Sequence, residues 1–327
     1  MKHFRRLDFG ELEDRADDYD AYIAATPGVD TYCSTTPWVL SAREAFHGSS
    51  EPLIIEVDEG FAAFMVVPTE RLGRTAFPLE ATWGMASPFA CKHPDQTMRV
   101  LARALQTLRA EWDTLYVLGL RVGGAVADQL VRNFAGRYRL GQGMKTARCA
   151  ARLDGGWDGY LSRRTPKFRK NARNNTRRCE AAGVSFVEIR PLDAVSAASV
   201  FERVLTIEER SWKGRAGTGI DTGRMRAFYA TMFPRLARRG ALRVGFAVRD
   251  GVDVAYIAGG HGSDGYRGLQ ISFDDDLRHL ALGSYCHLRT IRALCEERVP
   301  VYDMGQDMEY KHRWGEAIIE TQAIVVL

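Results

Sequence analysis

The chain repeats one pattern of apolar and polar positions in its two halves. Residues 53–68 read LIIEVDEGFAAFMVVP, and residues 242–258 read LRVGFAVRDGVDVAYIA. In each, two β-rich apolar runs flank an acidic turn with glycine, which is typical of a β-hairpin because glycine supplies positive φ in tight turns. A helical stretch and another short apolar run follow both hairpins. The pattern predicts an α/β (α+β) module used twice, as residues 1–153 and 154–327.

The second half can be divided further from its caps and periodicity. Thr165-Pro166 predicts the start of a helix that runs to about Ala182. The apolar spacing of Met225, Phe228, Met232 and Leu236 predicts a second helix. The other expected elements are strand 184–190, helices 193–213 and 221–240, strands 241–249, 252–260 and 265–273, a helix after residue 283, strand 301–305, a helical turn that carries residue 310, and a last strand.

Composition is typical of a folded soluble protein, with 46% hydrophobic and 26% charged residues among 327. No run approaches 18 uninterrupted apolar residues, so the sequence predicts no membrane span. The first 20 residues lack the apolar segment of a secretory signal, which predicts a cytoplasmic protein. Six scattered cysteines without a CxxC pair predict reduced thiols and no bound metal.

Gly283-Ser284 opens the helix that follows the third predicted strand of the second half. The first turn of a helix leaves backbone N–H groups unpaired, and the helix macrodipole adds positive potential there. Both effects favour a phosphate, so we predict an anion site at this helix start. An ordinary capped helix is the structural alternative, because Gly and Ser are common caps.

Positive charge is concentrated in residues 163–178, RRTPKFRKNARNNTRR, which hold eight Lys/Arg and no acid. The formal net charge of the whole chain is only +4, so the remainder is slightly acidic. Three interpretations stay open. The segment is a solvated surface helix, it holds the 3′-phosphate of coenzyme A or the acidic face of an acyl carrier protein, or it attracts tRNA or another nucleic acid.

Several local sequences resemble one family of transferases. They are IEERSWKGRAGTGI (207–220), SFDDD before an LGS turn, YDMG followed by YKHRWG, and STTPWVLSAREAF (34–46). Together with the element order they resemble GNAT acyltransferases of the CelD-like branch, which is related to Fem-type tandem-GNAT transferases. The resemblance implies that each module is a mixed, mostly antiparallel sheet flanked by helices. The chain departs from the GNAT phosphate signature, which is reduced here to Arg278-x-x-x-x-Gly283-Ser284.

The resemblance also assigns residues to the donor and to the reaction. The strand before the phosphate helix would present a backbone N–H to the acyl carbonyl, and Arg278, Leu282, Gly283 and Ser284 would hold the pyrophosphate of an acyl-CoA. The matching strand residues are Gln270, Ile271, Ser272 and Phe273. Tyr310 would protonate the departing thiolate, and Lys311 would stabilise an anionic tetrahedral state. Packing of Tyr310 over the sheet and a surface position for Lys311 are the structural alternatives.

Two residues are candidates for the general base, Asp274 and His261. Asp274 has Asp275 and Asp276 beside it, and crowded carboxylates raise one another's pKa toward neutrality. A solvated acidic turn is the alternative.

On the acceptor side, the resemblance implies substrate contacts from a helix and from the short strand that follows the phosphate helix. These residues are Glu208, Glu209, Trp212, Lys213 and Asp303.

The sequence therefore predicts an N-acyltransferase that uses an acyl-CoA, or an acyl carrier protein, to modify a primary amine of a small molecule, sugar or peptide. The module 1–153 would be degenerate and lie on the acceptor side, and the module 154–327 would bind the donor and catalyse. Two alternatives stay open: a Fem-like transferase that uses aminoacyl-tRNA, and a non-catalytic binding protein with a decayed acyl site.

Overall fold

The computed structural model of the protein describes residues 4–327 and divides the chain into two compact units. Unit 1 consists of Met1–Ala147 with Glu320–Leu327, and unit 2 consists of Arg148–Ile319. The expected boundary after residue 153 therefore lies inside unit 2. The last residues join unit 1 because β13 (Ala317–Val326) pairs there with β6 (Thr114–Val117).

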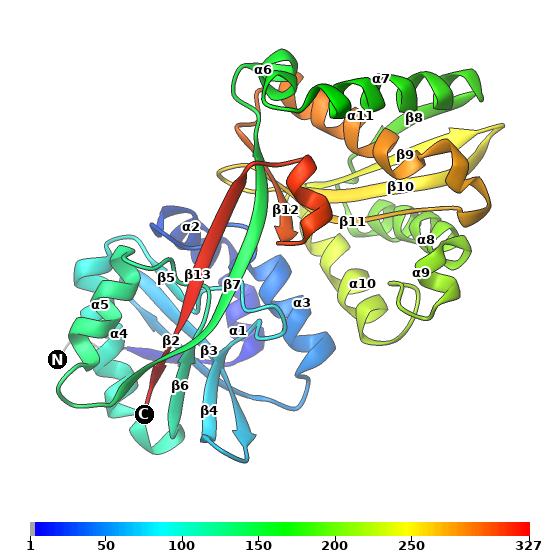
Figure 1. Ribbon diagram of the computed structural model, residues 1–327. Coiled ribbons are helices and arrows are strands. Elements are labelled where there is room, and N and C mark those ends of the chain that lie inside the picture. The colour runs from blue at the N-terminus through cyan, green and yellow to red at the C-terminus, as the bar shows by residue number, and fades with distance from the viewer. Residues whose placement is uncertain (1–3) are drawn as a thin grey trace. The chain divides into compact units, whose positions relative to one another are not determined.

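Unit 1 is a sheet with helices on both faces (Figure 1). Its strand order is β1 (Arg5–Leu7), β2 (Glu51–Val57), β3 (Gly60–Thr69), β4 (Gly73–Pro78), β6 and β13, with β5 (Phe89–Cys91) paired to β3. Its helices are α1 (Phe9–Asp14), α2 (Ala16–Ala25), α3 (Thr36–Phe46), α4 (Pro94–Thr107), η1 (Arg109–Glu111) and α5 (Ala125–Phe134). Leu53, Ile54 and Ile55 on β2 are all fully buried, because both faces of the sheet are covered.

The strands of unit 2 follow the order β7, β12, β11, β10, β9 and β8, and β7 enters unit 2 with its last residues, 148–152. The strands are β7 (Leu140–Arg152), β8 (Val184–Ile189), β9 (Leu242–Arg249), β10 (Val252–His261), β11 (Tyr266–Phe273) and β12 (Val301–Gln306). Neighbours are antiparallel except for β11 and β12, which are parallel. This is the mixed, mostly antiparallel sheet that the sequence predicts.

Helices cover both faces of the unit 2 sheet (Figure 1). Helices α7 (Pro166–Ala181) and α11 (Leu282–Glu296) contact each other and the strands β8 to β10 on one face, and α8 (Ala194–Arg210) and α10 (Gly223–Arg238) lie on the other. The shorter elements are α6 (Gly156–Ser162), α9 (Trp212–Arg215), η2 (Asp275–Leu280) and η3 (Glu309–Arg313). The cap that the sequence predicts for α7 is present, since the Thr165 side chain accepts from the Phe168 amide.

One expected helix is divided in the structure. The sequence predicts a single helix over 193–213, but α8 ends at Arg210 and α9 begins at Trp212. Ser211 adopts an extended backbone between them and caps α9 through a side-chain bond from the Gly214 amide. Serine competes with helical backbone hydrogen bonds in this way, and helical spacing alone does not reveal it.

All six cysteines are buried and free of disulfides. No helix within residues 4–327 has the length and apolar content that a membrane span requires. In the same residues, no group of three or more His, Cys, Asp or Glu is placed to hold a metal ion.

Candidate functional site

The parallel ladder between β11 and β12 is short. It consists of Tyr266 opposite Tyr302 and Arg267 opposite Asp303. Beyond Arg267, β11 stays paired with β10 but has no pairing with β12 within residues 4–327. Residues 268 to 271 of β11 are partly exposed there. In the part of the chain that the structure describes, the backbone donors and acceptors of this part of β11 therefore lack a strand partner on the β12 side.

A β-bulge interrupts β11 at the point where the two strands separate. Ala258 pairs with Gln270, whereas Gly259 pairs with Gly268, so Leu269 is the extra residue. Bulges turn backbone groups and side chains away from the regular ladder and occur often beside active sites. The bulge lies directly before the stretch Gln270 to Phe273, to which the sequence assigns the acyl carbonyl contact.

Helix α11 begins against this strand. Its N-cap is Ala281, which has φ 61° and provides no side-chain hydrogen bond to the helix end. A Cβ placed on Gly283 would lie 3.5 Å from the Phe273 ring, and Ile271 is the next neighbour. The start of α11 thus packs on the face of β11 that Ile271 and Phe273 share.

The residues predicted to hold phosphate differ in how exposed they are at the start of α11. Leu282 is fully buried in the core, so only its backbone faces the helix end, whereas Gly283 and Ser284 are partly exposed. Arg278 is largely exposed, and its Nη2 lies 3.7 Å from Asp275 Oδ2. The structure brings the backbone of the three helix residues to β11, and it leaves the Arg278 side chain on the surface.

The opposite face of β11 is held by α9. Lys213 Nζ donates to the Gln270 side-chain oxygen at 2.9 Å and to the main-chain oxygen of Ile271 at 2.8 Å. Glu208 Oε1 lies 3.8 Å from the same ammonium. Burial lowers the pKa of Lys213, and the nearby Glu208 opposes that shift. Lys213 therefore fixes the strand segment that follows the bulge.

Glu208 itself is fully buried at the end of α8. Its Oε2 accepts from the Tyr256 hydroxyl at 2.8 Å, and its Oε1 accepts from the Ile220 amide at 3.2 Å. Burial, followed by the Glu208 charge, raises the pKa of Tyr256 well above its ordinary value, so this phenol stays a donor. Tyr256 lies opposite Ser272 in the ladder, which places Glu208, Tyr256 and β11 in one polar cluster.

Two glycines let the chain close around Glu208. A Cβ on Gly214 would collide with the main-chain oxygen of Glu208, and one on Gly219 would lie 2.9 Å from Glu208 Oε1. Gly214 and Gly219 of the GRAGTGI sequence therefore allow the chain to approach the backbone and the carboxylate of Glu208 closely. Glu209 and Trp212, which the sequence assigns to the acceptor, are exposed on the outside of the same corner, Trp212 to 56%.

A second polar cluster lies at the end of β12. Asp303 accepts from Arg267 at 3.1 Å and from the Gly305 amide at 2.7 Å, and it also forms an ion pair with Arg148. Lys311 Nζ donates to the main-chain oxygens of Met304 at 2.8 Å and Gln306 at 2.7 Å. Asp303 is thus engaged by internal arginines, and its predicted contact with an acceptor stays a prediction.

Tyr310 and Lys311 lie on η3, directly after this cluster. Tyr310 is 51% exposed, and the Lys311 ammonium lies 5.8 Å from the centroid of its ring. Burial raises the pKa of Tyr310, and the phenol is therefore protonated at neutral pH. Burial lowers the pKa of Lys311, and Asp303 opposes that shift. This pair can supply a proton and a cation.

The two candidates for the general base have different surroundings. Asp274 caps η2 through the Asp276 amide at 3.1 Å, and its Oδ2 lies 3.4 Å from Arg210. His261 packs edge-on against Tyr266, and its Nε2 lies 3.9 Å from a Glu297 oxygen. Burial, and then Arg243, lowers the pKa of His261, which favours the neutral imidazole that a base requires.

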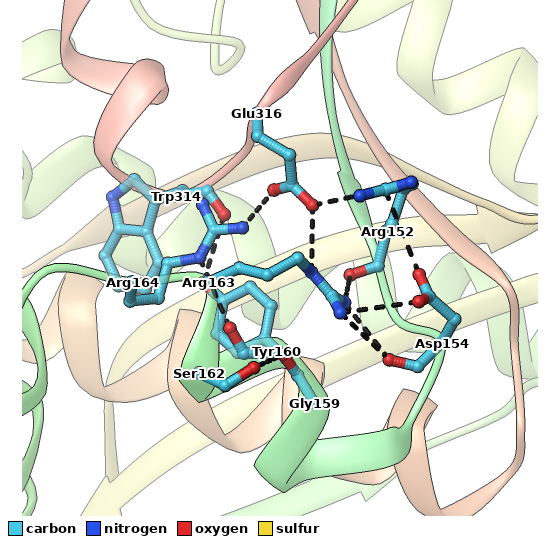
Figure 2. A network of polar contacts seen from close by, with 9 residues as sticks. All are labelled: Arg152, Asp154, Gly159, Tyr160, Ser162, Arg163, Arg164, Trp314 and Glu316. Carbon is cyan, nitrogen blue, oxygen red and sulfur yellow. Dashed lines mark hydrogen bonds and ion pairs between the residues drawn. The ribbon is translucent and has the colours of Figure 1, made fainter.

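The segment after η3 is fixed to α6 by a network of arginines (Figure 2). Glu316 accepts from Arg163 at 3.1 Å, pairs with Arg164, and lies 3.6 Å from Arg152. Arg163 also donates to the main-chain oxygens of Arg152 and Asp154. This network fixes the chain at Glu316, directly after Trp314 and η3.

The structure thus collects the predicted residues into two groups. One joins Glu208 and Lys213 to Gln270 on β11, and the other joins Asp303 to Lys311 at the end of β12. Sequence reasoning missed Tyr256, Arg148 and Arg267. Tyr256 sits in an apolar strand pattern and the two arginines lie on different strands, so no local signal marks them.

Comparisons with known proteins agree with this architecture. A family model described as an acetyltransferase (GNAT) domain matches residues 166–312, from α7 to η3. The solved structure of FemX superposes with a TM-score of 0.66 at 11% identity and covers 98% of this chain and 96% of that chain. The chain therefore shares the fold of FemX, and its residues 166–312 match a GNAT domain. This confirms the fold that the local sequences predict.

Two further solved structures share this fold over most or all of the chain. A conserved protein of unknown function from Bacteroides thetaiotaomicron VPI-5482 has a TM-score of 0.64 at 14% identity, with 100% of both chains covered. L-PGS from Bacillus licheniformis has a TM-score of 0.58 at 12% identity and covers 98% of this chain and 92% of that chain. At identities this low, the similarity shows a shared fold and nothing more specific. A comparison with curated protein sequences gives no match.

Proposed function

We propose that the protein is an N-acyltransferase that moves an acyl group from a thioester, carried by coenzyme A or by an acyl carrier protein, to a primary amine. The observation that carries the proposal is the junction of β11 and α11. There, a bulged strand edge without a β12 partner meets a helix start that lacks a side-chain cap.

Each part of this junction suits one part of a thioester. The unpaired amides at the start of α11 suit the phosphate, because anions bind at helix N-termini. The β11 edge beside Leu269 suits the acyl carbonyl, because backbone N–H groups stabilise the oxyanion that forms when the amine attacks. The thioester carbon–sulfur bond then breaks as the amide bond forms.

Two proton transfers complete the reaction. The attacking amine loses a proton to a base, for which Asp274 and His261 remain the candidates. The departing thiolate gains a proton, and Tyr310 is the proposed donor because its phenol stays protonated at neutral pH. Lys311 lies beside it as a fixed cation for the anionic intermediate.

Titration calorimetry with acetyl-CoA, with longer acyl-CoAs and with a loaded acyl carrier protein tests the proposal. Binding of at least one of them, followed by transfer to an amine, is the expected result. An absence of heat with every one of these donors would remove the thioester hypothesis.

The second candidate is a transferase that uses aminoacyl-tRNA. It is favoured by Lys311, which matches the lysine of Fem-type enzymes and is held at the end of β12 by two main-chain oxygens. The candidate predicts binding of charged tRNA with a steep dependence on salt. A filter-binding titration at low salt that detects no tRNA would exclude it.

A further inference from the structure

Helix α7 carries a row of basic side chains that the fold itself does not use. Lys167, Lys170, Arg173 and Arg177 are exposed, and none of them has a hydrogen bond or an ion pair within residues 4–327. We call these four residues the α7 basic row. Glu180 is the single acid on the helix.

The other four basic residues of the segment 163–178 have structural roles. Arg163 and Arg164 bind Glu316, Arg169 donates to the main-chain oxygen of Arg164 at 2.6 Å, and Arg178 donates to that of His279 at 2.9 Å. The segment thus divides into four residues that hold the fold together and four that face solvent. The contacts of the first four residues explain their place in the fold. The α7 basic row makes no such contacts with the rest of the described chain.

The α7 basic row lies along one side of the helix. Lys170, Arg173 and Arg177 fall within one sector at 100° per residue, and Lys167 is at its margin. At a rise of 1.5 Å per residue, the row from Lys167 to Arg177 extends about 15 Å. One small anionic group cannot neutralise charges spread over that length, so the row suits an elongated anionic surface.

The row ends beside the proposed donor site. Arg178 and Cys179, in the last turn of α7, bond to the main-chain oxygens of His279 and Leu280, at 2.9 Å and 3.2 Å. These two residues directly precede Ala281, the N-cap of α11. A partner bound along the row would therefore have one end next to the helix start that we assign to a phosphate.

We propose that the α7 basic row docks the acidic helix of an acyl carrier protein, whose phosphopantetheine arm delivers the acyl group to α11 and β11. This inference rests on the proposed function and specifies its donor. A single helix with opposite charge is the complement of a single basic row. The arm also carries one phosphate, which matches a helix start without the glycine-rich turn of a diphosphate site.

A nucleic acid fits these observations less well. Single-stranded ends bind through stacking on exposed aromatic rings. The one aromatic residue of α7, Phe168, is instead packed edge-on against Trp314, with ring centroids 5.0 Å apart. The formal charge outside residues 163–178 is slightly negative as well, whereas a nucleic acid is bound best by a broadly basic surface.

The test compares two double charge reversals. Arg173→Glu with Arg177→Glu removes the centre of the α7 basic row. Arg99→Glu with Arg103→Glu is the matched control, since it reverses two exposed arginines at the same spacing on α4 of unit 1. Dissociation constants are measured at low and moderate salt for an acetyl-loaded acyl carrier protein, for acetyl-CoA and for charged tRNA.

The docking proposal expects a specific loss. The α7 variant should bind the loaded carrier at least about tenfold more weakly at low salt, while the control and the affinity for acetyl-CoA stay unchanged. Equal carrier binding by the α7 variant and the wild type would overturn the proposal, as would a loss confined to charged tRNA. If the wild type binds acetyl-CoA but no carrier, the docking proposal fails alone; if it binds neither, the proposed function fails with it.

Discussion

The ammonium of Lys213 donates a hydrogen bond of 2.8 Å to the main-chain oxygen of Ile271. A side chain on α9 thereby holds the strand segment that follows the bulge in β11. The same ammonium lies 3.8 Å from Oε1 of the buried Glu208 carboxylate. Removing it would affect both the geometry of the strand and the balance of buried charge.

Replacement of Lys213 by Met should therefore be costly. Because the change leaves a buried carboxylate without its cation, we expect the free energy of unfolding to fall by about 3 kcal/mol. Urea unfolding measures the loss, and hydrogen exchange of the β11 amides should locate it. Arg215→Met is the control, since its ion pairs with Asp275 and Asp276 are on the surface and should contribute less than about 1 kcal/mol. Equal effects of the two variants would show that Lys213 does not hold β11.

An acidic residue at the start of α11 should have opposite effects on helix stability and on the affinity for an anion. Ser284→Asp places a carboxylate in the first turn, where the helix dipole favours it by about 0.5 kcal/mol. The same carboxylate would repel a phosphate, so the dissociation constant for acetyl-CoA should rise by at least about tenfold. Thermal unfolding and calorimetry measure the two effects, with Ser284→Asn as the uncharged control. A variant that binds acetyl-CoA as well as the wild type would place the phosphate elsewhere.

Tyr310→Phe tests the proton donor. The side chain is half exposed, so the free energy of unfolding should change by less than about 0.5 kcal/mol. Loss of a general acid should lower kcat by about 100-fold. Since the pKa of Tyr310 is raised above its ordinary value near 10, activity should persist to that pH and decline only above it, as the phenol deprotonates. CoA release measured across pH 7 to 11 should show this decline in the wild type, and an unchanged kcat in the variant would exclude the role.

His287 should make the stability of the protein depend on pH. Burial, and then Lys311 and Arg313, lowers its pKa from 6.5 to about 4. Between these values the unfolded chain binds more protons than the folded one, so stability rises with pH through this window and is lost on acidification. The expected loss from pH 7 to pH 4 is about 3 kcal/mol from this residue.

His287→Gln should flatten that dependence, because the amide does not titrate. Exposed His93, at the N-cap of α4, provides the control variant His93→Gln. Urea unfolding at intervals of pH measures both. An unchanged slope in His287→Gln would show that the stacked imidazole on Trp314 titrates normally.

Much of unit 2 could be predicted from the sequence because its signals are local. The Thr165-Pro166 cap, the Asp250-Gly251 hairpin and the spacing of apolar residues each act within a few positions, and α7, β9, β10 and α10 formed as expected. The break at Ser211 was missed because a serine cap inside a helical pattern leaves the periodicity intact.

The chemistry of the site was less predictable because it depends on register. Glu208 was expected to face a substrate, yet a one-residue difference in strand register decides whether Tyr256 or a neighbour points toward it. The link between Asp303 and Arg267 likewise comes from a parallel ladder of two residue pairs. Sequence spacing gives residue types, and only the paired strands show which of them meet.

Trp314 joins several of the elements that surround the proposed proton donor. Its main-chain oxygen accepts from Tyr160 of α6, and its ring contacts Phe168 of α7 and His287 of α11. A shift of any one of these helices would be transmitted through the indole to the neighbouring turn that bears Tyr310. Under the proposed function, substitutions around the indole are therefore expected to alter turnover by misaligning this turn, even though they lie away from the proposed donor site.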